Sequence, residues 1–257
     1  MTTLQHIASL AAQAGEIILH NTQAPVHRKE GHYNFVTDAD TAVQTFLTER
    51  LRDVLPAARF FCEEQENDAL GNEPTFIIDP IDGTCNFMRG RGCSAVSIAL
   101  TEGRRPVLGV VCNPYRGETF TAELGKGTQL NGQPVRVSDI SFENALVAMG
   151  TSPYYSELAE KTFRAAALFQ HRAGDLRRTG SAAIDFADVC CGRADVFFEY
   201  RLSPWDFAAG ARLVQEAGGV FCAFDRPGQP PDYGRPSPTL ACNPRCAEEA
   251  LRILSAV

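Results

Sequence analysis

The chain has 257 residues, of which 44% are hydrophobic and 21% charged, a composition typical of a globular protein with a sizeable core. Its formal net charge is −7 and it contains no basic run, which argues against nucleic acid held mainly through its phosphate backbone. The N-terminus lacks the basic segment of a signal peptide, and no apolar stretch reaches the roughly 18–20 residues that span a bilayer. We therefore expect a cytoplasmic protein with neither a nucleic-acid nor a membrane partner.

The first half of the chain predicts two helices followed by mostly antiparallel strands. Apolar residues from Leu4 to Ile18 repeat at helical spacing, which predicts a helix to about His20. Thr37 offers N-cap chemistry for a second helix that ends at Pro56. The segment between the helices, 26–35, is predicted to be a loop or hairpin. Strands are predicted at 59–62, 76–78, 94–100, 106–111, 118–123 and 129–137, the last around an Asn131-Gly132 turn.

The second half alternates strands with helices. Strands are predicted at 145–149, 176–179, 196–199, 220–222 and 239–241, and helices at 155–169, 181–191, 204–217 and 244–254. A Pro-rich loop occupies 227–238. This alternation is typical of layered α/β structure. The sequence has no internal repeat and no long linker, so we predict a single domain over 1–257, with an N-terminal half to about 140 and a C-terminal half from about 141.

The nine cysteines and five histidines do not predict a metal site. No Cys-x-x-Cys pair is present, and although Cys242 and Cys246 are four residues apart, no further zinc ligand lies near them in the sequence. Most cysteines lie in apolar stretches, where a reduced thiol packs as a small hydrophobe. The histidines (His6, His20, His27, His32 and His171) have no ligand spacing, so we expect them to be surface or structural residues.

Two carboxylates follow the apolar run 75–78. Asp79 comes directly after the run and Asp82 three residues later, so we expect both to point into one small volume. Like charges so close together do not both stay ionised without a cation. The carbonyl of Ile81 adds a further hard oxygen, and the pattern predicts a Mg²⁺ site. Gly83 and Thr84 follow at once, and their backbone N–H groups suit a phosphate.

Acids elsewhere in the chain repeat this pattern. Glu63 and Glu64 follow the apolar segment 60–62, and neighbouring parallel strands present their ends side by side, so Glu63 is a candidate for a shared ligand. Asp206 opens a predicted helix. Its negative charge could simply interact favourably with the helix dipole. A second metal ion at Asp79 and Asp82, however, would need another carboxylate ligand. For Asp40 the residues alone favour a helix-capping role.

These motifs, in this order, resemble the inositol monophosphatase family of Mg²⁺-dependent, Li⁺-sensitive sugar phosphatases. Segment 79–87, Asp-Pro-Ile-Asp-Gly-Thr-Cys-Asn-Phe, is similar to the family's first signature, and segment 205–210, Trp-Asp-Phe-Ala-Ala-Gly, to its second. The match continues through 34–40, 62–64, 113–114, 125–127, 131–132, 180–183 and 216–219. The resemblance covers essentially the whole chain. It implies an αβαβα five-layer sandwich of the α/β class and a homodimer.

The resemblance also implies a ligand set for two to three Mg²⁺ ions. Glu63, Asp79 and the Ile81 carbonyl would hold the first ion, and Glu63 would also hold a weaker third. Asp79, Asp82 and Asp206 would hold the second.

The substrate contacts implied by the resemblance surround this metal set. Gly83 and Thr84 would bind the phosphate, and the Thr84 hydroxyl, paired with Asp40, would orient the attacking water. Lys29 lies at the position of a family lysine near the phosphate. Glu199 lies at the position where inositol-selective members have an acid that binds substrate hydroxyls. The remaining implied substrate contacts are Asp82, Ala182 and Asp206. Arg89 and Arg91 follow the first signature, and could be solvated charges or contacts to a second phosphate or carboxylate on the substrate.

The implied activity is hydrolysis of a phosphate monoester by a metal-activated water, without a covalent intermediate. Myo-inositol monophosphate or a similar sugar or polyol phosphate is the expected substrate. Histidinol phosphate and fructose 1,6-bisphosphate are alternatives. A 3′-phosphoadenosine nucleotidase is less favoured because the chain is short for that branch. A function of another class also stays open, namely a non-catalytic regulator that keeps the fold and binds RNA or a protein partner.

Overall fold

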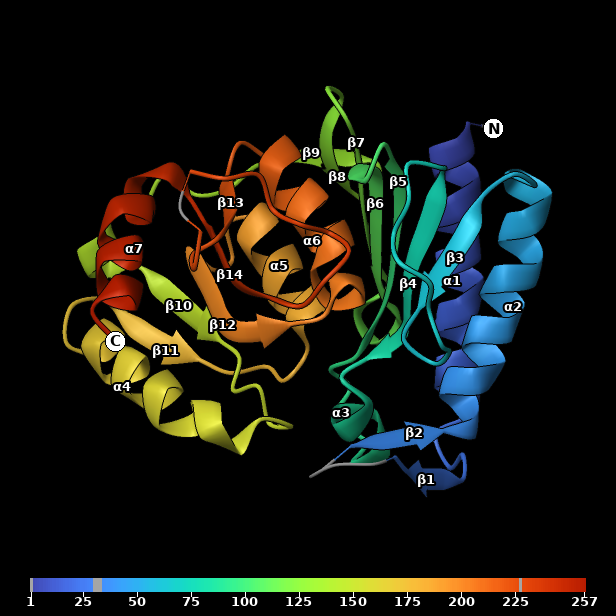
Figure 1. Cartoon of the computed structure of the whole chain (residues 1–257), viewed down its shortest axis with the longest axis horizontal. Helices are drawn as coiled ribbons and strands as arrows, with labels where there is room; N and C mark the ends of the chain where they lie inside the picture. Colours follow the sequence, from blue (N-terminus) through green and yellow to red (C-terminus); the bar gives the residue numbers. More distant parts are fainter. Residues whose placement is uncertain (1, 30–33, 227) are drawn as a thin grey trace.

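The computed structural model describes residues 2–29, 34–226 and 228–257. Two N-terminal helices, α1 (Thr3–His20) and α2 (Asp38–Val54), form its first layer (Figure 1). Each helix begins at a capping box, in which an N-cap threonine and the side chain three residues later bond each other's backbone N–H. The buried faces of both helices pack against one face of a large sheet.

That sheet has seven strands in the order β3-β4-β5-β6-β7-β8-β9. β3 and β4 are parallel, and every other neighbouring pair is antiparallel. At the β8–β9 turn, Asn131 and Gly132 have positive φ angles of 48° and 80°, as a two-residue hairpin of this type requires. The strands are β3 (Arg59–Cys62), β4 (Thr75–Asp82), β5 (Ala95–Glu102), β6 (Arg105–Asn113), β7 (Glu118–Glu123), β8 (Gly127–Leu130) and β9 (Gln133–Val135).

The central layer consists of α5 (Ala182–Cys190) and α6 (Pro204–Glu216), which lie between the two sheets (Figure 1). Their side chains join residues from both sheets in one buried apolar cluster that includes Ile77, Phe186 and Phe197. The first turns of both helices therefore lie close to the seven-stranded sheet, where β4 ends.

The second sheet and two outer helices complete the layers. Its five strands follow the order β11-β10-β12-β14-β13, and α4 (Ala159–Gln170) and α7 (Ala247–Ser255) cover its outer face. The strands are β10 (Leu146–Met149), β11 (Asp175–Arg177), β12 (Val196–Leu202), β13 (Val220–Ala223) and β14 (Ser237–Cys242). The remaining elements are β1 (Val26–Arg28), β2 (Phe35–Thr37), α3 (Thr84–Met88) and the 3₁₀ turns Pro114–Arg116, Phe142–Asn144, Ser156–Leu158 and Pro244–Cys246.

The five-layer αβαβα prediction is confirmed, with differences at element boundaries. β4 continues to Asp82, whereas the apolar run predicted an end at residue 78. The helices predicted to start at 155 and 244 each begin with a 3₁₀ turn before α4 and α7. Segment 26–35, predicted to be a loop or hairpin, contains β1 and the first residue of β2, and these two strands pair antiparallel. Residues 30–33, which include His32, and Pro227 of the predicted loop lie outside the described residues.

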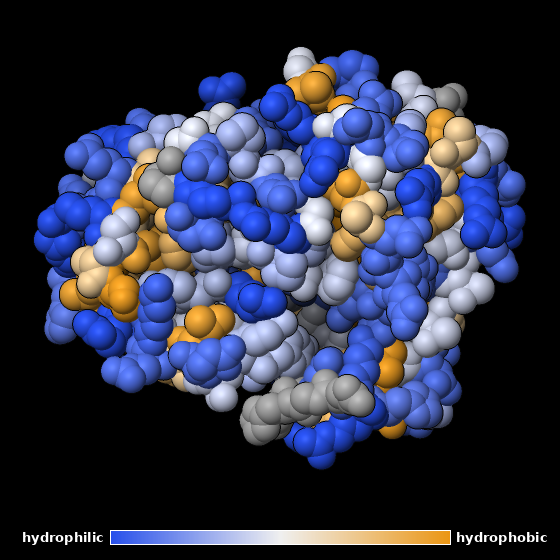
Figure 2. All heavy atoms as spheres, viewed as in Figure 1, coloured by the Kyte–Doolittle hydropathy of each residue, from blue (hydrophilic) through white to orange (hydrophobic). Residues whose placement is uncertain are grey.

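The surface features match the composition. The face drawn in Figure 2 is hydrophilic over most of its area, with apolar residues in small separate groups. Among the described residues, no helix is both long and apolar enough to cross a membrane. All nine cysteines have free thiols, and His6, His20, His27 and His171 are exposed.

Candidate active site

A bulge near the end of β4 brings Asp79 and Asp82 to the same face of the sheet. Side chains three positions apart on a regular strand point to opposite faces. Here Asp79 pairs with Ser97 and Asp82 with Ala95 of β5, so β4 carries one extra residue between them. Ile81 accordingly packs with the α1–α2 layer, and both aspartates face the central layer. The Ile81 N–H donates to Asp79 Oδ1 at 3.0 Å and fixes that side chain.

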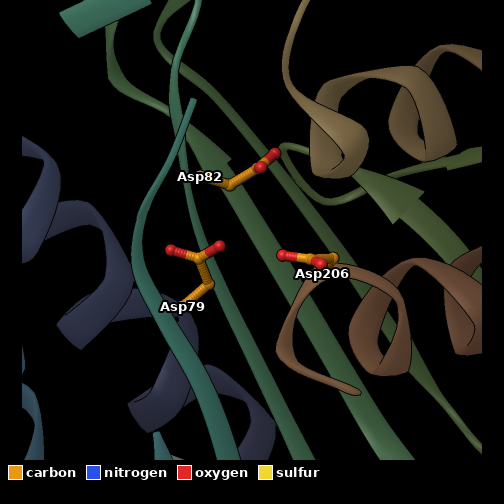
Figure 3. Close-up of side chains that lie close together, drawn as sticks. All are labelled: Asp79, Asp82 and Asp206. Atoms are coloured by element: carbon orange, nitrogen blue, oxygen red, sulfur yellow. The ribbon is translucent and has the colours of Figure 1, made fainter. Parts of the chain in front are cut away.

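Asp206 completes a group of three carboxylates (Figure 3). One oxygen from each of Asp79, Asp82 and Asp206 lies within 4.8 Å of the others. Asp206 is the third residue of α6, and its Oδ2 accepts from the Ser203 N–H at 2.6 Å in a capping box. The capping interpretation and the ligand interpretation therefore both apply, because only one of its oxygens caps the helix.

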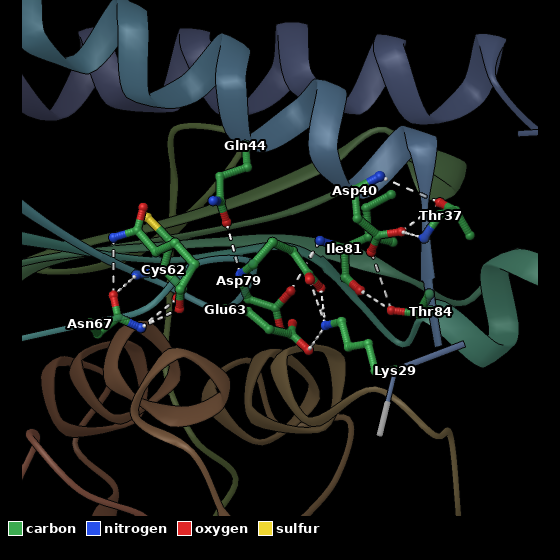
Figure 4. A network of polar contacts seen from close by, with 12 residues as sticks. Lys29, Thr37, Asp40, Gln44, Cys62, Glu63, Asn67, Asp79, Ile81 and Thr84 are labelled. Atoms are coloured by element: carbon green, nitrogen blue, oxygen red, sulfur yellow. Dashed lines mark hydrogen bonds and ion pairs between the residues drawn. The ribbon is translucent and has the colours of Figure 1, made fainter. Parts of the chain in front are cut away.

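Glu63 lies beside Asp79 and belongs to a second group of charges (Figure 4). It follows β3, the parallel neighbour of β4, and its N–H donates to the Ile78 carbonyl at 3.1 Å. The Glu63 and Asp79 carboxyl groups lie close enough to shift each other's pKa. Lys29 Nζ lies 2.5 Å from a carboxylate oxygen of Glu64 and 3.8 Å from Glu63 Oε1. Asp79 thus belongs to both groups, and Lys29 forms ion pairs with Glu63 and Glu64.

Thr84 and Asp40 meet as the resemblance implied. The Thr84 hydroxyl lies 3.3 Å from Asp40 Oδ1 and 3.2 Å from the Ile81 carbonyl, so its proton has two possible acceptors. Asp40 is fully buried and also accepts from the Thr37 N–H at 2.7 Å. Asp40 is therefore both the capping acid of α2 and the partner of Thr84.

The turn after β4 requires glycine. Gly83 has a φ of 88°, and a Cβ there would lie 3.1 Å from the Cys93 carbonyl oxygen and 3.2 Å from that of Gly180. The first turn of α5 approaches from the other side, where the Ser181 hydroxyl and the Ala183 N–H both donate to Asp82 Oδ2, the latter at 2.7 Å. The N-terminus of α5 thus fixes Asp82.

Burial raises the pKa of every acid in the metal-ligand set. It raises the pKa of Asp82 to about 6 against the hydrogen bonds from Ser181 and Ala183. Burial and the charge of Glu64 raise the pKa of Glu63 to about 7. The pKa values of Asp79 and Asp206 rise well above the usual range through burial and then the neighbouring acids. A bound cation would offset this repulsion.

Lys29 and Asp40 respond to burial in the expected directions. Burial acts to lower the Lys29 pKa, but the carboxylates of Glu63 and Glu64 outweigh it, so the pKa is raised and the ammonium stays charged. Burial raises the pKa of Asp40 despite the hydrogen bonds from Thr37 and Thr84.

These residues line a cleft of about 810 Å³. Ala182, at the start of α5, and Glu199, on β12, lie in its wall. The Ser152 N–H donates to Glu199 Oε1 at 2.6 Å, and burial raises the pKa of Glu199 to about 7 in spite of this bond. A Cβ at Gly150 would lie 1.8 Å from Glu199 Oε2, so the carboxyl occupies space that only glycine leaves. Arg89 and Arg91 also line the cleft and are exposed.

The structure thus brings together every residue of the predicted site, and it adds residues that the sequence analysis did not single out. Ser181 donates to Asp82. Segment 180–183, Gly-Ser-Ala-Ala, begins a predicted helix, and its serine was a usable signal for a helix cap there. Gln44 accepts from the Glu64 N–H at 3.0 Å. Asn86 donates to the carbonyls of Cys93 and Thr179 at 2.7 and 3.1 Å. Contacts such as these join distant segments and leave no pattern in the sequence.

Comparisons with known proteins identify the family and agree with the fold. A model of the inositol monophosphatase family matches residues 2–257. Inositol monophosphatase 2 of Solanum lycopersicum is 42% identical over 221 residues, which cover 82% of this chain and 83% of that protein. Nus factor SuhB of Escherichia coli K12 is 37% identical over 230 residues, which cover 87% and 86%. Among solved structures, Thermotoga maritima IMPase has a TM-score of 0.89 and 31% identity, covering 100% of this chain and 98% of that one. The chain belongs to the inositol monophosphatase family.

Proposed function

We propose that the protein is a Mg²⁺-dependent phosphomonoester hydrolase that acts on a sugar or polyol phosphate. The observation that carries this proposal is the group of three carboxylates within 4.8 Å of one another, next to the Gly83-Thr84 turn in the wall of a cleft. Closely spaced carboxylates are hard-oxygen ligands that suit Mg²⁺. Burial, and then the neighbouring acids, raise the pKa values of Asp79 and Asp206, and a divalent cation would offset both effects.

The donor set fits more than one ion. Asp79, Asp82 and Asp206 would hold one, and Asp79 with Glu63 and the Ile81 carbonyl would hold another. Bound Mg²⁺ would supply Lewis-acid chemistry, which provides a nucleophile at neutral pH and stabilises charge on the leaving oxygen. The cations would also let an acidic protein accept a phosphate dianion.

Thr84 and Asp40 are proposed to orient the attacking water. When the Thr84 hydroxyl donates to the Asp40 carboxylate, its oxygen can accept a hydrogen bond from the attacking water. As the water gives its proton to Thr84, the proton of the Thr84 hydroxyl passes to Asp40. The backbone N–H groups of Gly83 and Thr84 belong to a turn in the cleft wall and would bind phosphate oxygens.

Glu199 and the cleft size support a polyhydroxylated substrate. The cleft volume falls within the range usual for small-molecule sites. With one oxygen of Glu199 held by Ser152, the other can accept from a substrate hydroxyl. We therefore propose myo-inositol monophosphate or a similar polyol phosphate, with histidinol phosphate and fructose 1,6-bisphosphate as alternatives.

The proposal is tested by phosphate release from these compounds, with and without Mg²⁺ and with added Li⁺. Wild type, Asp82→Asn and Asp139→Asn are compared, the last removing an equal charge from an exposed site. We expect Mg²⁺-dependent, Li⁺-inhibited turnover of at least one compound, unchanged in Asp139→Asn and reduced at least about 10²-fold in Asp82→Asn. Equal turnover in Asp82→Asn, or turnover independent of divalent ions, would refute the proposed site.

The role of Thr84 is tested by a pair of substitutions. Thr84→Ala removes the hydroxyl that contacts Asp40 and should reduce kcat by about 10²-fold or more, in the range for losing a positioned proton-transfer group. Thr84→Ser keeps the hydroxyl and should retain most activity. Equal loss in both variants would show that the side-chain volume, not the hydroxyl, is what matters.

The similarity to Nus factor SuhB favours a second candidate, a regulator that works through a partner. All four predicted metal-ligand acids are present, which favours catalysis as at least one role. If partner binding is retained in Asp82→Asn while turnover is lost, the two roles separate. If wild type shows partner binding but no turnover of any phosphate ester, the regulator becomes the better description.

A further inference from the structure

Four arginines line the same cleft as the metal-ligand acids. They come from separate segments, namely Arg89 and Arg91 after α3, Arg178 after β11, and Arg201 on β12, and all four are exposed. Within the described ranges, none of the four lies within ion-pair distance of a carboxylate. A protein with a net charge of −7 thus has, at its cleft, four guanidinium groups that form no ion pair with the described residues.

One short loop holds two of these arginines in place. The Thr151 hydroxyl accepts from Arg178 Nε at 3.2 Å and from Nη2 at 3.1 Å. The Arg201 guanidinium carbon lies 4.4 Å from the centre of the Tyr155 ring, a stacking contact. Arg178 and Arg201 are therefore oriented by neighbours, unlike charges that are free in solvent.

The loop is itself fixed to β12. The Ser152 N–H donates to Glu199 Oε1 at 2.6 Å, and the Ser152 hydroxyl lies 3.3 Å from the Arg201 carbonyl oxygen. Ser152 has a positive φ of 42°, an uncommon conformation for a residue other than glycine. Residues 150–155 thus form a fixed segment of the cleft wall. This segment contains Thr151 and Tyr155, which contact Arg178 and Arg201.

Arg178 lies close to the proposed phosphate turn. A Cβ at Gly180 would lie 3.2 Å from Arg178 Nη1, and the Gly180 carbonyl oxygen is 3.2 Å from where a Gly83 Cβ would stand. Cys85, the residue after Thr84, lines the cleft together with Arg89 and Arg178. Burial raises the pKa of its thiol, and the charges of Arg178 and Arg89 oppose the rise. The two guanidinium groups therefore lie on the cleft wall beside the first phosphate position.

We infer that the arginines form a second anion subsite, which holds a second phosphate of a sugar or polyol bisphosphate. This inference rests on the proposed function, because the first phosphate is the one bound at Gly83-Thr84. Guanidinium N–H groups bind phosphate oxygens strongly, and within the described part of the chain Arg178 Nη1 donates to no other group. Arg178 and Arg201 provide the fixed contacts, and Arg89 and Arg91 add positive charge nearby.

A plain steering role makes a different prediction. Exposed charges at the mouth of a cleft accelerate the approach of any phosphate ester, and salt screens the effect. A subsite instead discriminates between substrates that differ only in the second phosphate. The two possibilities are separated by comparing a bisphosphate with its matched monophosphates.

The kinetic experiment uses fructose 1,6-bisphosphate with fructose 1-phosphate and fructose 6-phosphate, in Mg²⁺. Wild type, Arg178→Gln, Arg201→Gln and the exposed control Arg136→Gln are compared. We expect each cleft variant to lower kcat/KM at least about 10-fold for the bisphosphate and less than about 3-fold for the monophosphates, with no change in the control. Equal losses on all substrates, or no loss on the bisphosphate, would overturn the inference.

A binding experiment separates this inference from the proposed activity. Trp205 is the chain's single tryptophan and lines the cleft, so its fluorescence reports occupancy. Fructose 1,6-bisphosphate and fructose 6-phosphate are titrated with Ca²⁺ in place of Mg²⁺. Tighter binding of the bisphosphate, lost in Arg178→Gln, supports the subsite even if no ester is hydrolysed. Turnover of monophosphates with no bisphosphate preference in either experiment would leave the phosphatase proposal intact and refute the subsite.

Discussion

Glu199 shows how one buried acid can make the stability of this protein depend on pH. Its carboxylate accepts from the N–H and the hydroxyl of Ser152, both neutral donors. Burial nevertheless raises its pKa to about 7, with the charge of Asp82 adding to the rise and that of Arg178 opposing it. The loss of water around the carboxylate outweighs two neutral hydrogen bonds.

The effect of pH on stability follows from the direction of this shift. The pKa is about 4.3 in the unfolded chain, so between about pH 4.5 and 7 the folded protein keeps a proton that the unfolded chain has released. The stabilisation is complete below that window and is lost as pH rises through 7. Glu199→Gln cannot ionise, so from pH 5 to pH 8 its free energy of unfolding should fall less than that of wild type, by an amount on the order of 2 kcal/mol.

Urea unfolding at pH 5 and pH 8 in EDTA measures this difference. Glu157→Gln changes an exposed glutamate and should follow wild type. If Glu199→Gln loses as much stability as wild type over this range, Glu199 is ionised in the folded protein at both pH values, and the expected shift is wrong.

At the scale of elements, the sequence predicted those parts that depend on neighbours in the chain. The Thr37 cap of α2 follows from local hydrogen bonding. The bulge in β4 was not predicted, although Pro80 was a signal for it. Proline has no N–H and within a sheet is confined to edges and bulges, yet β4 lies between β3 and β5. A central strand containing Pro80 therefore had to be irregular there.

The parts that escaped prediction depend on packing between distant segments. Ser181 and Ala183 bond Asp82 across 99 and 101 residues. Segment 180–183 indicates a helix start, but no local pattern indicates that this start meets Asp82, because that contact results from α5 docking between the sheets. The motifs located the metal-ligand acids, but the groups that hold those acids became visible only in the folded structure.

The close contact between α5 and α6 gives a prediction for the central layer. A Cβ at Gly210 would lie 2.4–2.6 Å from atoms of Phe186. Alanine is favoured over glycine in a helix by about 1 kcal/mol, but overpacking of a core costs about 1–3 kcal/mol. At contacts this short we expect the clash to outweigh the helix preference, so Gly210→Ala should lower the melting temperature.

Thermal unfolding of Gly210→Ala, Phe186→Leu and the double variant tests this explanation. Phe186→Leu makes room at the contact, so the double variant should be more stable than the sum of the single effects predicts. Strict additivity would mean that the two side chains do not compete for the same space.

At the scale of the whole molecule, the candidate site depends on both halves of the chain. Asp79 and Asp82 lie on β4 of the first half, whereas Asp206 begins α6 of the second, and Ser181 holds Asp82 from α5. Docking of the halves therefore brings together buried acids that repel each other. The single domain over 1–257 stays a prediction, and metal binding provides a way to test it.

Mg²⁺ should stabilise both halves together. A ligand at 100 times its Kd adds about 2.7 kcal/mol to the free energy of unfolding, and about 2–4 °C per kcal/mol is typical of chains this long. Calorimetry in EDTA and in excess Mg²⁺ should therefore show one transition that moves up by about 5–10 °C. Asp139→Asn should show the full shift, and Ser181→Ala a smaller one because Asp82 loses a donor. Asp82→Asn should keep only the part of the shift that comes from the ion held by Glu63, Asp79 and the Ile81 carbonyl. Two transitions, of which only one responds to Mg²⁺, would contradict the single domain. The two halves would then unfold independently, although both supply metal ligands.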